Sequence, residues 1–250
     1  MSLHLSRLRL RHAPDTAALA RVLLPEDDDM RVGTSHRLVW SLFADTPDRT
    51  RDFLWREDGG GTWQRTTFLV LSRRPPVDTH ALFDVETKPF APALRAGRTL
   101  RFRLRAASSL SVPAEPGRRG MRVDPVWHEL RKLPPAERAG ARAAVAQRVL
   151  SGWLARQGER GGFRLVEAPL APDGSDPALT VDGDLQRRLP RDGERARRAT
   201  RARPGDIRFS TFDLEGLLTV EDPALFLAAL AHGFGRAKAF GCGLMLIRPG

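Results

Sequence analysis

The stretch TLRFRLRA, residues 99–106, alternates apolar and basic side chains along its length. This period of two is typical of a strand with one buried face, so we expect Phe102, Leu104 and Ala106 to face a core and the neighbouring arginines to face outward. The opening stretch LHLSRLRLR, residues 3–11, has a similar near-alternation. A strand pattern that restarts in mid-chain predicts two modules, and 250 residues are enough for two cores.

The first module is expected over residues 1–92. After the first strand, residues 16–24 follow Asp15 with a helical pattern, and residues 34–43 form a helical pattern capped by Thr34 or Ser35. The stretches 51–57 and 66–72 are expected to be strands joined by a glycine turn, and 77–83 to be a short helix. The order β-α-β-β-α-β is that of a ferredoxin-like module.

The second module is expected over residues 98–250, after a linker at 90–98. Its first strand, 99–106, precedes a helical pattern at 134–157 with Ala146, Leu150, Trp153 and Leu154 on one face. Strand patterns at 162–168 and 207–220 lead to a helix that begins at Asp222-Pro223 and ends at Gly233. With a last strand at 243–249, the fold class is α+β, with two tandem ferredoxin-like (RRM-like) domains.

The charge of the chain indicates a polyanionic partner. The formal net charge is +11, and only three of the basic residues are lysines. Nucleic acid is the partner that such a field favours. The single cysteine, Cys242, excludes an internal disulfide framework, and the N-terminus has no apolar core typical of a signal peptide or membrane span. We expect a cytoplasmic protein with no membrane partner.

The most basic segment, LQRRLPRDGERARRATRARPGDIR at 185–208, holds nine arginines against three acids. Such a block is typical of an arm that binds a polyanion, and the alternative is a solvated hairpin. The candidate RNA-binding residues in it are Arg187, Arg188, Arg191, Arg195, Arg197, Arg198 and Arg201.

The tail HGFGRAKAFGCGLMLIRPG, residues 232–250, crowds glycines around Arg236 and Lys238. Glycine loses much entropy on ordering, so this backbone is expected to approach something closely. One interpretation of the loop, 233–243, is that Gly235 and Gly241 bring amides to an RNA backbone while the two cations meet phosphates. The alternative is a helix C-cap followed by a bulge.

The histidines and acids give few sites from residue types alone. His36 follows the expected helix start and is flanked by Arg31 and Arg37, whereas the other five histidines lack partners at metal-ligand spacing. A structural role is the usual one for a lone helical histidine. The acidic run at 26–29 is expected to be a solvated loop, because four consecutive acids cannot all face one ion. We expect no metal and no cofactor.

Several of these motifs together resemble one family. GFGRAKAFGCGLMLIRP near the C-terminus, LRFRLRA in mid-chain, and SHRLVWSLFAD followed by RDFLWR near the N-terminus are similar to the CasE family, the repeat-processing endoribonucleases of type I-E CRISPR systems. The resemblance covers nearly the whole chain. It implies two ferredoxin-like domains and metal-independent cleavage of CRISPR repeat RNA at the 3′ base of a stem-loop. It also implies that the product stays bound within the Cascade complex.

The resemblance implies roles for particular residues. His36 occupies the catalytic histidine position, with Arg37 as the basic residue after it, and the arm from Arg187 to Arg203 matches a hairpin that grips the RNA stem. The family commonly has a tyrosine three residues before the histidine. This chain has Gly33 there and no tyrosine at all. The second catalytic role then falls to Thr34, Ser35 or Arg31, or is not filled.

The implied reaction is attack of the 2′-OH on the adjoining phosphate, giving a 2′,3′-cyclic phosphate and a 5′-OH. Histidine suits the proton transfer because both of its forms are accessible near neutral pH, although the sequence does not say whether it acts as base or acid. Arg37, Arg31 and Lys238 are candidate phosphate contacts. The alternative is a catalytically inactive RNA-binding subunit of a CRISPR ribonucleoprotein complex.

Overall fold

The fold is seen in a computed structural model that describes residues 2–44, 46, 50–59, 66–112, 121–166, 179–189 and 207–250. The chain forms two compact units. The first contains Met1–Pro92, Gln186–Phe209 and Ala237–Leu244, and the second contains Ala93–Leu185, Ser210–Arg236 and Met245–Gly250. The first segment of the first unit covers the range expected for the first module. Two later segments, expected in the second module, group with the first unit instead.

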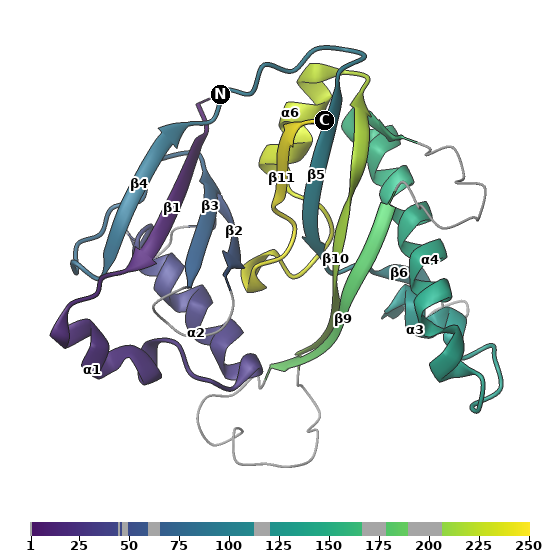
Figure 1. The fold of residues 1–250 in the computed structure, drawn as a ribbon, viewed down its shortest axis with the longest axis horizontal. Coiled ribbons are helices and arrows are strands. Elements are labelled where there is room, and N and C mark those ends of the chain that lie inside the picture. The colour runs from purple at the N-terminus through teal and green to yellow at the C-terminus, as the bar shows by residue number, and fades with distance from the viewer. Residues whose placement is uncertain are drawn as a thin grey trace. The chain divides into compact units, whose positions relative to one another are not determined.

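The first unit is a four-stranded antiparallel sheet with two helices (Figure 1). Its elements are β1 (His4–Leu10), α1 (Pro14–Leu23), α2 (Asp28–Ser41), β2 (Phe53–Asp58), β3 (Thr67–Ser72) and β4 (Phe83–Pro89). The strand order across the sheet is β2-β3-β1-β4. Strands next to each other in the sheet are therefore not always consecutive in the chain.

The core of the first unit lies between α2 and one face of this sheet. Leu38 and Val39 of α2, and Leu42 at its C-cap, are buried in one cluster with strand residues such as Leu8 and Phe68. Phe43, just after the helix, stacks on Phe53 with ring centroids 4.5 Å apart. Burial of this apolar stripe fixes the rotation of α2, and so decides which helix residues face away from the core.

Helix α2 begins earlier than the sequence pattern predicts. The start at Thr34 or Ser35 is wrong, because the helix begins at Asp28 and Asp27 is its N-cap. The loop expected at 26–29 holds only for residues 26 and 27, since Asp28 and Asp29 are in the first turn of the helix. The Asp27 carboxylate accepts a hydrogen bond from the Met30 amide at 2.8 Å. Acids in a first turn are stabilised by the helix dipole. The sequence pattern did not predict this start because the charged residues 26–29 have no apolar periodicity.

The short helix predicted at 77–83 is also wrong. Asp78 folds the segment into a turn, where its carboxylate accepts from the amides of His80 at 3.3 Å and Phe83 at 2.7 Å. Ala81 has a φ of 51°, which a helix does not allow. A local side-chain acceptor has here replaced helical hydrogen bonds.

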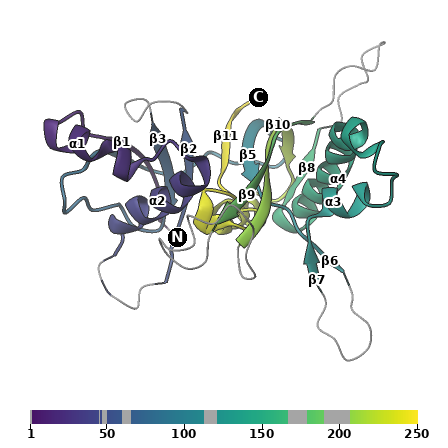
Figure 2. The same ribbon diagram turned by 90° about the horizontal axis from the view of Figure 1, so that it is seen from below.

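The second unit also combines helices with an antiparallel sheet (Figure 2). Its elements are β5 (Thr99–Ala106), β6 (Leu110–Val112), β7 (Met121–Val123), α3 (Pro125–Leu130), α4 (Arg138–Gly161), β8 (Phe163–Leu165), β9 (Leu179–Leu189), β10 (Ile207–Val220), α6 (Pro223–His232) and β11 (Met245–Pro249). The end of β9 and the start of β10, within residues 186–209, belong to the first unit. The main sheet has the order β11-β5-β10-β8, and β9 pairs with β10. If β5, β8, β10 and β11 are numbered 1 to 4, their order across the sheet is 4-1-3-2. This is the order 2-3-1-4 of the first unit, read from the other edge.

Most elements of the second unit are confirmed. Phe102, Leu104 and Ala106 of β5 are buried, as are Leu150 and Leu154 of α4. Helix α6 begins and ends where the sequence places it, with Asp222 accepting from two amides of the first turn. Helix α3 was not predicted, although Asp124-Pro125 gives the same start signal as Asp222-Pro223. Among the described residues, no helix is long and apolar enough to cross a bilayer.

Two glycines of α4 give a matched stability test. A Cβ at Gly158 would lie 2.3 Å from the Phe163 carbonyl oxygen, whereas a Cβ at Gly140 meets nothing within 4 Å. We expect Gly158→Ala to lower the free energy of unfolding by about 1–3 kcal/mol, the usual range for overpacking. Gly140→Ala should be neutral or stabilising by up to about 1 kcal/mol. Thermal and urea unfolding measure both, and equal effects would contradict the packing described.

Candidate active site

The candidate site lies at the middle of α2 in the first unit, where His36 follows a buried serine. Ser35 is fully buried, and His36 is half-buried. The imidazole lies edge-on to Trp40, one helical turn later, at 5.8 Å between ring centroids and 84° between planes. Residues four apart lie on one helix face, so this contact follows directly from the sequence spacing.

A segment from the end of the chain forms the other side of the site. The 3-10 helix η2 (Lys238–Phe240) contacts both α2 and β2. Phe240 lies edge-on to His36, with ring centroids 6.1 Å apart, and stacks on Phe209 at 5.5 Å. The imidazole is thus enclosed by aromatic edges from two parts of the chain.

The backbone around η2 has positive φ angles on both sides and lies close to Trp55. Ala237 and Gly241, on either side of η2, have φ angles of 53° and 76°. The Trp55 indole donates a hydrogen bond to the Ala239 carbonyl at 3.2 Å, and a Cβ at Gly241 would lie 3.3 Å from the same ring. Gly241 therefore lets the backbone lie against Trp55, and its predicted contact with RNA stays a prediction.

The Nε2 atom of His36 is buried and has no hydrogen-bond partner among the described residues. A buried polar atom without a partner is unfavourable by about 1–3 kcal/mol. In native proteins such an atom calls for a reason, and a ligand or catalytic role is one. His4 also has a buried nitrogen without a partner among the described residues, so the charges and aromatic rings around His36, and not this atom alone, distinguish it.

Two arginines act on this imidazole, and one of them also acts on Lys238. Burial lowers the pKa of His36 below its ordinary value, and the charges of Arg51 and then Arg37 lower it further. Burial also lowers the pKa of Lys238, and Arg51 again adds to the effect. Arg51 precedes β2 and its own pKa is lowered by burial. Because each charge disfavours the others, the cluster is suited to an anion.

The other candidates on α2 are already engaged. Arg31 donates to Glu57 at 2.6 Å and to the Thr66 hydroxyl at 2.5 Å, and only 12% of its side chain is exposed. Ser35 donates to the same Glu57 carboxylate at 3.2 Å. Glu57 thereby ties α2 to β2, and it neutralises the charge that the sequence suggested for a phosphate contact.

Thr34 and Arg37 lie on the exposed side of the same helix. The Thr34 hydroxyl donates to the Met30 carbonyl at 3.0 Å and accepts from Arg37 at 3.2 Å. A Cβ at Gly33, where the resemblance expects a tyrosine, meets nothing within 4 Å. None of the described side chains fills the place next to Gly33.

The candidate RNA-binding arginines fall into two groups. Arg187, in β9, pairs with Asp28 at 3.1 Å and approaches Asp29 at 3.9 Å, so the acidic run at the start of α2 is its partner. Arg188 lies in β9 with only its backbone described. The remaining candidates lie outside the described residues, and these are Arg191, Arg195, Arg197, Arg198 and Arg201.

Gly235 and Arg236 belong to the second unit. Gly235 has a φ of 76°, and a Cβ there would lie 2.9 Å from the Ala107 carbonyl oxygen and 3.2 Å from the Trp153 ring. Arg236 donates its amide to Ala107 at 3.0 Å, and its side chain is exposed. A packing reason therefore exists for Gly235, and RNA contacts of both residues stay predictions.

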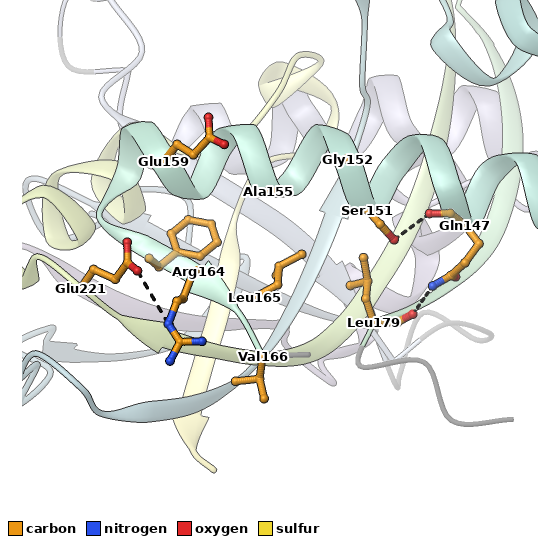
Figure 3. Close-up of a pocket in the computed structure, with 11 residues that line it drawn as sticks. Gln147, Ser151, Gly152, Ala155, Glu159, Arg164, Leu165, Val166, Leu179 and Glu221 are labelled. Atoms are coloured by element: carbon orange, nitrogen blue, oxygen red, sulfur yellow. Dashed lines mark hydrogen bonds and ion pairs between the residues drawn. The ribbon is translucent and has the colours of Figure 1, made fainter. Parts of the chain in front are cut away.

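The second unit also carries a groove of about 860 Å³ beside α4 (Figure 3). Ser151 donates to the Gln147 carbonyl at 2.7 Å, Gln147 donates to the Leu179 carbonyl, and Arg164 pairs with Glu221 at 3.7 Å. The described lining includes no histidine, cysteine or lysine. It offers packing surface rather than a reaction centre. Within the described ranges, no three His, Cys, Asp or Glu side chains gather as metal ligands would.

Sequence reasoning missed several residues of the His36 site. Arg51, Glu57, Phe209 and Phe240 reach it from elements far apart in the chain. Four consecutive residues of β2 are buried, so no alternation in this strand marks Glu57. Arg51 and Phe240 lie within the motifs RDFLWR and GFGRAKAFGCGLMLIRP that carry the resemblance, but those motifs do not say that the two side chains meet at His36.

The chain is similar to several CRISPR-associated proteins. A family model described as "CRISPR associated protein" matches residues 3–249. The chain is 33% identical over 162 residues to the CRISPR-associated endoribonuclease Cse3 of Thermus thermophilus, an alignment that covers 65% of this chain and 61% of that relative. It is 27% identical over 214 residues to the Cascade subunit CasE of Escherichia coli, covering 86% and 90%.

A solved structure extends the likeness over the full length. Thermus thermophilus Cse3, bound to an RNA representing a pre-cleavage complex, has a TM-score of 0.66 and 27% identity, with 100% of both chains covered. Since the family model and these relatives agree over nearly all 250 residues, the chain belongs to the CRISPR-associated CasE family.

Proposed function

We propose that this protein is an endoribonuclease that binds the stem-loop of a CRISPR repeat and cleaves precursor RNA at the 3′ base of the stem. The observation that carries the proposal is the buried Nε2 of His36, which has no hydrogen-bond partner among the described residues and is exposed to the positive charges of Arg51 and Arg37. The relatives named endoribonuclease support it. Membership of the family alone does not give the chemistry, which has to come from the site.

The fold is proposed to be a tandem of two ferredoxin-like domains. The shared strand order of the two main sheets supports this, and so does a helix-bearing connection between the first two main strands of each unit. In the first unit the second connection, between β3 and β4, lacks its helix. The first domain is then a reduced form of the fold.

His36 is proposed to act as the general base at the 2′-OH. Its lowered pKa keeps the imidazole neutral near pH 7, which is the form that accepts a proton. The 2′-oxygen attacks the adjoining phosphorus, and the products are a 2′,3′-cyclic phosphate and a 5′-OH. The RNA supplies its own nucleophile, so the protein aligns it and the reaction needs no metal.

Arg51 and Arg37 are proposed to contact the phosphate. Charge develops on the phosphate oxygens as the 2′-oxygen attacks, and fixed cations stabilise that charge. Arg31, predicted from the sequence to have this role, is better described as a positioning residue because Glu57 holds it. In the free protein the positive charges of Arg51, Arg37 and any protonated His36 repel one another. A bound phosphate reduces that repulsion.

The RNA has to reach an atom that solvent does not touch. Phe240 and Trp40 border the imidazole, so one of these side chains or η2 must shift when RNA binds. His36 as a residue is only half-buried, so part of it already meets solvent. Binding and opening of the site are then coupled events.

The arginine arm is proposed to hold the RNA stem, and the protein to remain on its product as a Cascade subunit in the cytoplasm. The net charge of +11 and the naming of the Escherichia coli relative support these roles. A-form RNA hides its base edges in a narrow major groove, so the arm is expected to recognise the shape of the stem.

A second candidate function is that of an inactive RNA-binding subunit. Gly33 in the place of the family tyrosine favours it, since one proton-transfer group is missing there. Cleavage of a labelled stem-loop RNA, carrying the repeat of the host's own CRISPR array, separates the two functions. Binding without cleavage would select the inactive subunit.

His36→Ala tests the catalytic assignment. We expect cleavage in single-turnover assays to fall by at least about 10²–10⁴, the usual contribution of acid-base catalysis, while RNA binding stays nearly unchanged. His80→Ala, at an exposed turn histidine of the same unit, should cleave normally. Loss of binding together with cleavage would instead assign His36 a structural role.

The source of the nucleophile gives a second test. We expect cleavage to survive excess EDTA, because the attacking oxygen belongs to the RNA. An RNA with 2′-deoxyribose at the scissile nucleotide should bind and remain intact. Cleavage of that RNA, or an absolute requirement for Mg²⁺, would refute the proposed chemistry.

The arm is tested through salt dependence. Replacing Arg197 and Arg198 together by Ala should weaken binding and reduce the slope of log K against log salt by about 0.7–0.9 for each phosphate that the arm no longer neutralises. Arg187→Ala is the matched control, because its guanidinium pairs with Asp28 and should change the slope less. If the slope of the double variant equals that of the wild type, the arm is a solvated loop.

A further inference from the structure

The proposed reaction needs a second proton transfer, which His36 cannot perform in the same step. The leaving 5′-oxygen must gain a proton while His36 holds the one taken from the 2′-OH. The family tyrosine position is Gly33, and its three neighbours on α2 are engaged as described: Arg31 and Ser35 with Glu57, and Thr34 with Met30 and Arg37. The donor therefore has to come from another element.

The element packed against His36 is η2, and it carries an ammonium group. Phe240 at its end contacts the imidazole, Ala239 in its middle is held by Trp55, and Lys238 begins it. With these two residues fixed and Ala237 in the left-handed region, little freedom is left to the Lys238 backbone. The aliphatic stem of Lys238 starts next to residues that already contact β2 and α2.

Arg51 links the two groups electrostatically. Its charge lowers the pKa of both His36 and Lys238, so the imidazole and the ammonium group each lie within reach of this one guanidinium. The other charged group that acts on His36 is Arg37 on α2, and Glu57 on β2 is paired with Arg31. The surroundings of Lys238 thus weaken its hold on a proton, as a general acid requires.

We propose that Lys238 is the second catalytic residue, the general acid that protonates the leaving 5′-oxygen opposite His36. The inference rests on the proposed endoribonuclease function. As the bond from O2′ to phosphorus forms, His36 takes the 2′ proton. As the bond from phosphorus to O5′ breaks, the Lys238 ammonium gives a proton to O5′. The protein then carries one proton more on His36 and one fewer on Lys238, and solvent restores both.

Lys238→Arg separates proton donation from charge. Arginine keeps the positive charge but does not give up its proton at neutral pH. On an all-oxygen stem-loop RNA of the host's CRISPR repeat, we expect single-turnover cleavage to fall by about 10²–10⁴ with binding unchanged. Lys88→Arg and Lys132→Arg, at the only other lysines of the chain, should cleave normally.

A sulfur substrate assigns the role to the leaving group. When sulfur replaces the 5′-oxygen at the scissile linkage, the leaving thiolate has an ordinary pKa of about 8.5 and departs without a proton. Lys238→Arg should then recover most of its lost rate, whereas His36→Ala should stay inactive. The cleavage rate of the wild type should also fall at alkaline pH, at a pH lower than the ordinary lysine pKa of 10.5. Lys238→Arg should not show this fall.

The outcomes separate the two proposals. If Lys238→Arg loses the same fraction of the cleavage rate on the all-oxygen and the sulfur RNA, or loses none on either, the role of Lys238 is overturned. The role of His36 is then unaffected. Recovery of His36→Ala by sulfur would exchange the two roles and overturn the inference as stated. If the wild type cleaves neither substrate while binding both, the proposed endoribonuclease function itself fails.

Discussion

The site depends on one contact, the hydrogen bond from the Trp55 indole to the Ala239 carbonyl with Gly241 lying against the same ring. A hydrogen bond of this kind is worth only about 0.5–1.5 kcal/mol net, but here it is combined with the burial of a tryptophan. It fixes η2 on β2, and through η2 it sets Phe240 against His36. Without this anchor the imidazole would have an aromatic neighbour on one side only.

Electrostatics divides the neighbourhood of α2 into two parts. Glu57 accepts from Arg31 and Ser35, so this part is neutral and serves to hold helix and strand together. Around His36 the positive charges of Arg51 and Arg37 lower the pKa of the imidazole, and Arg51 also lowers the pKa of Lys238. The first arrangement holds opposite charges together. The second brings like charges together, and an anion such as the phosphate of the proposed substrate would reduce their repulsion.

The sequence predicted the periodic elements and missed the local exceptions. β5, α4 and α6 are read correctly because alternation, an apolar helix face and an Asp-Pro start are local signals. The start of α2 and the turn at Asp78 escaped because side-chain acceptors decided them. His36 was found through resemblance, whereas Arg51 and Phe240 come from distant segments, and only the folded chain brings them together. Long-range assembly of this kind leaves no periodic trace in a sequence.

The place of η2 in the chain has a consequence for biosynthesis. Residues 237–244 belong to the first unit, although the chain builds most of the second unit before reaching them. During translation the N-terminal sheet emerges early, but His36 lacks its contact with Phe240 until residues 237–244 have left the ribosome. A polypeptide that stops before residue 237 would therefore lack one side of the proposed site. If the site acts as proposed, synthesis of the first unit alone would not produce the activity.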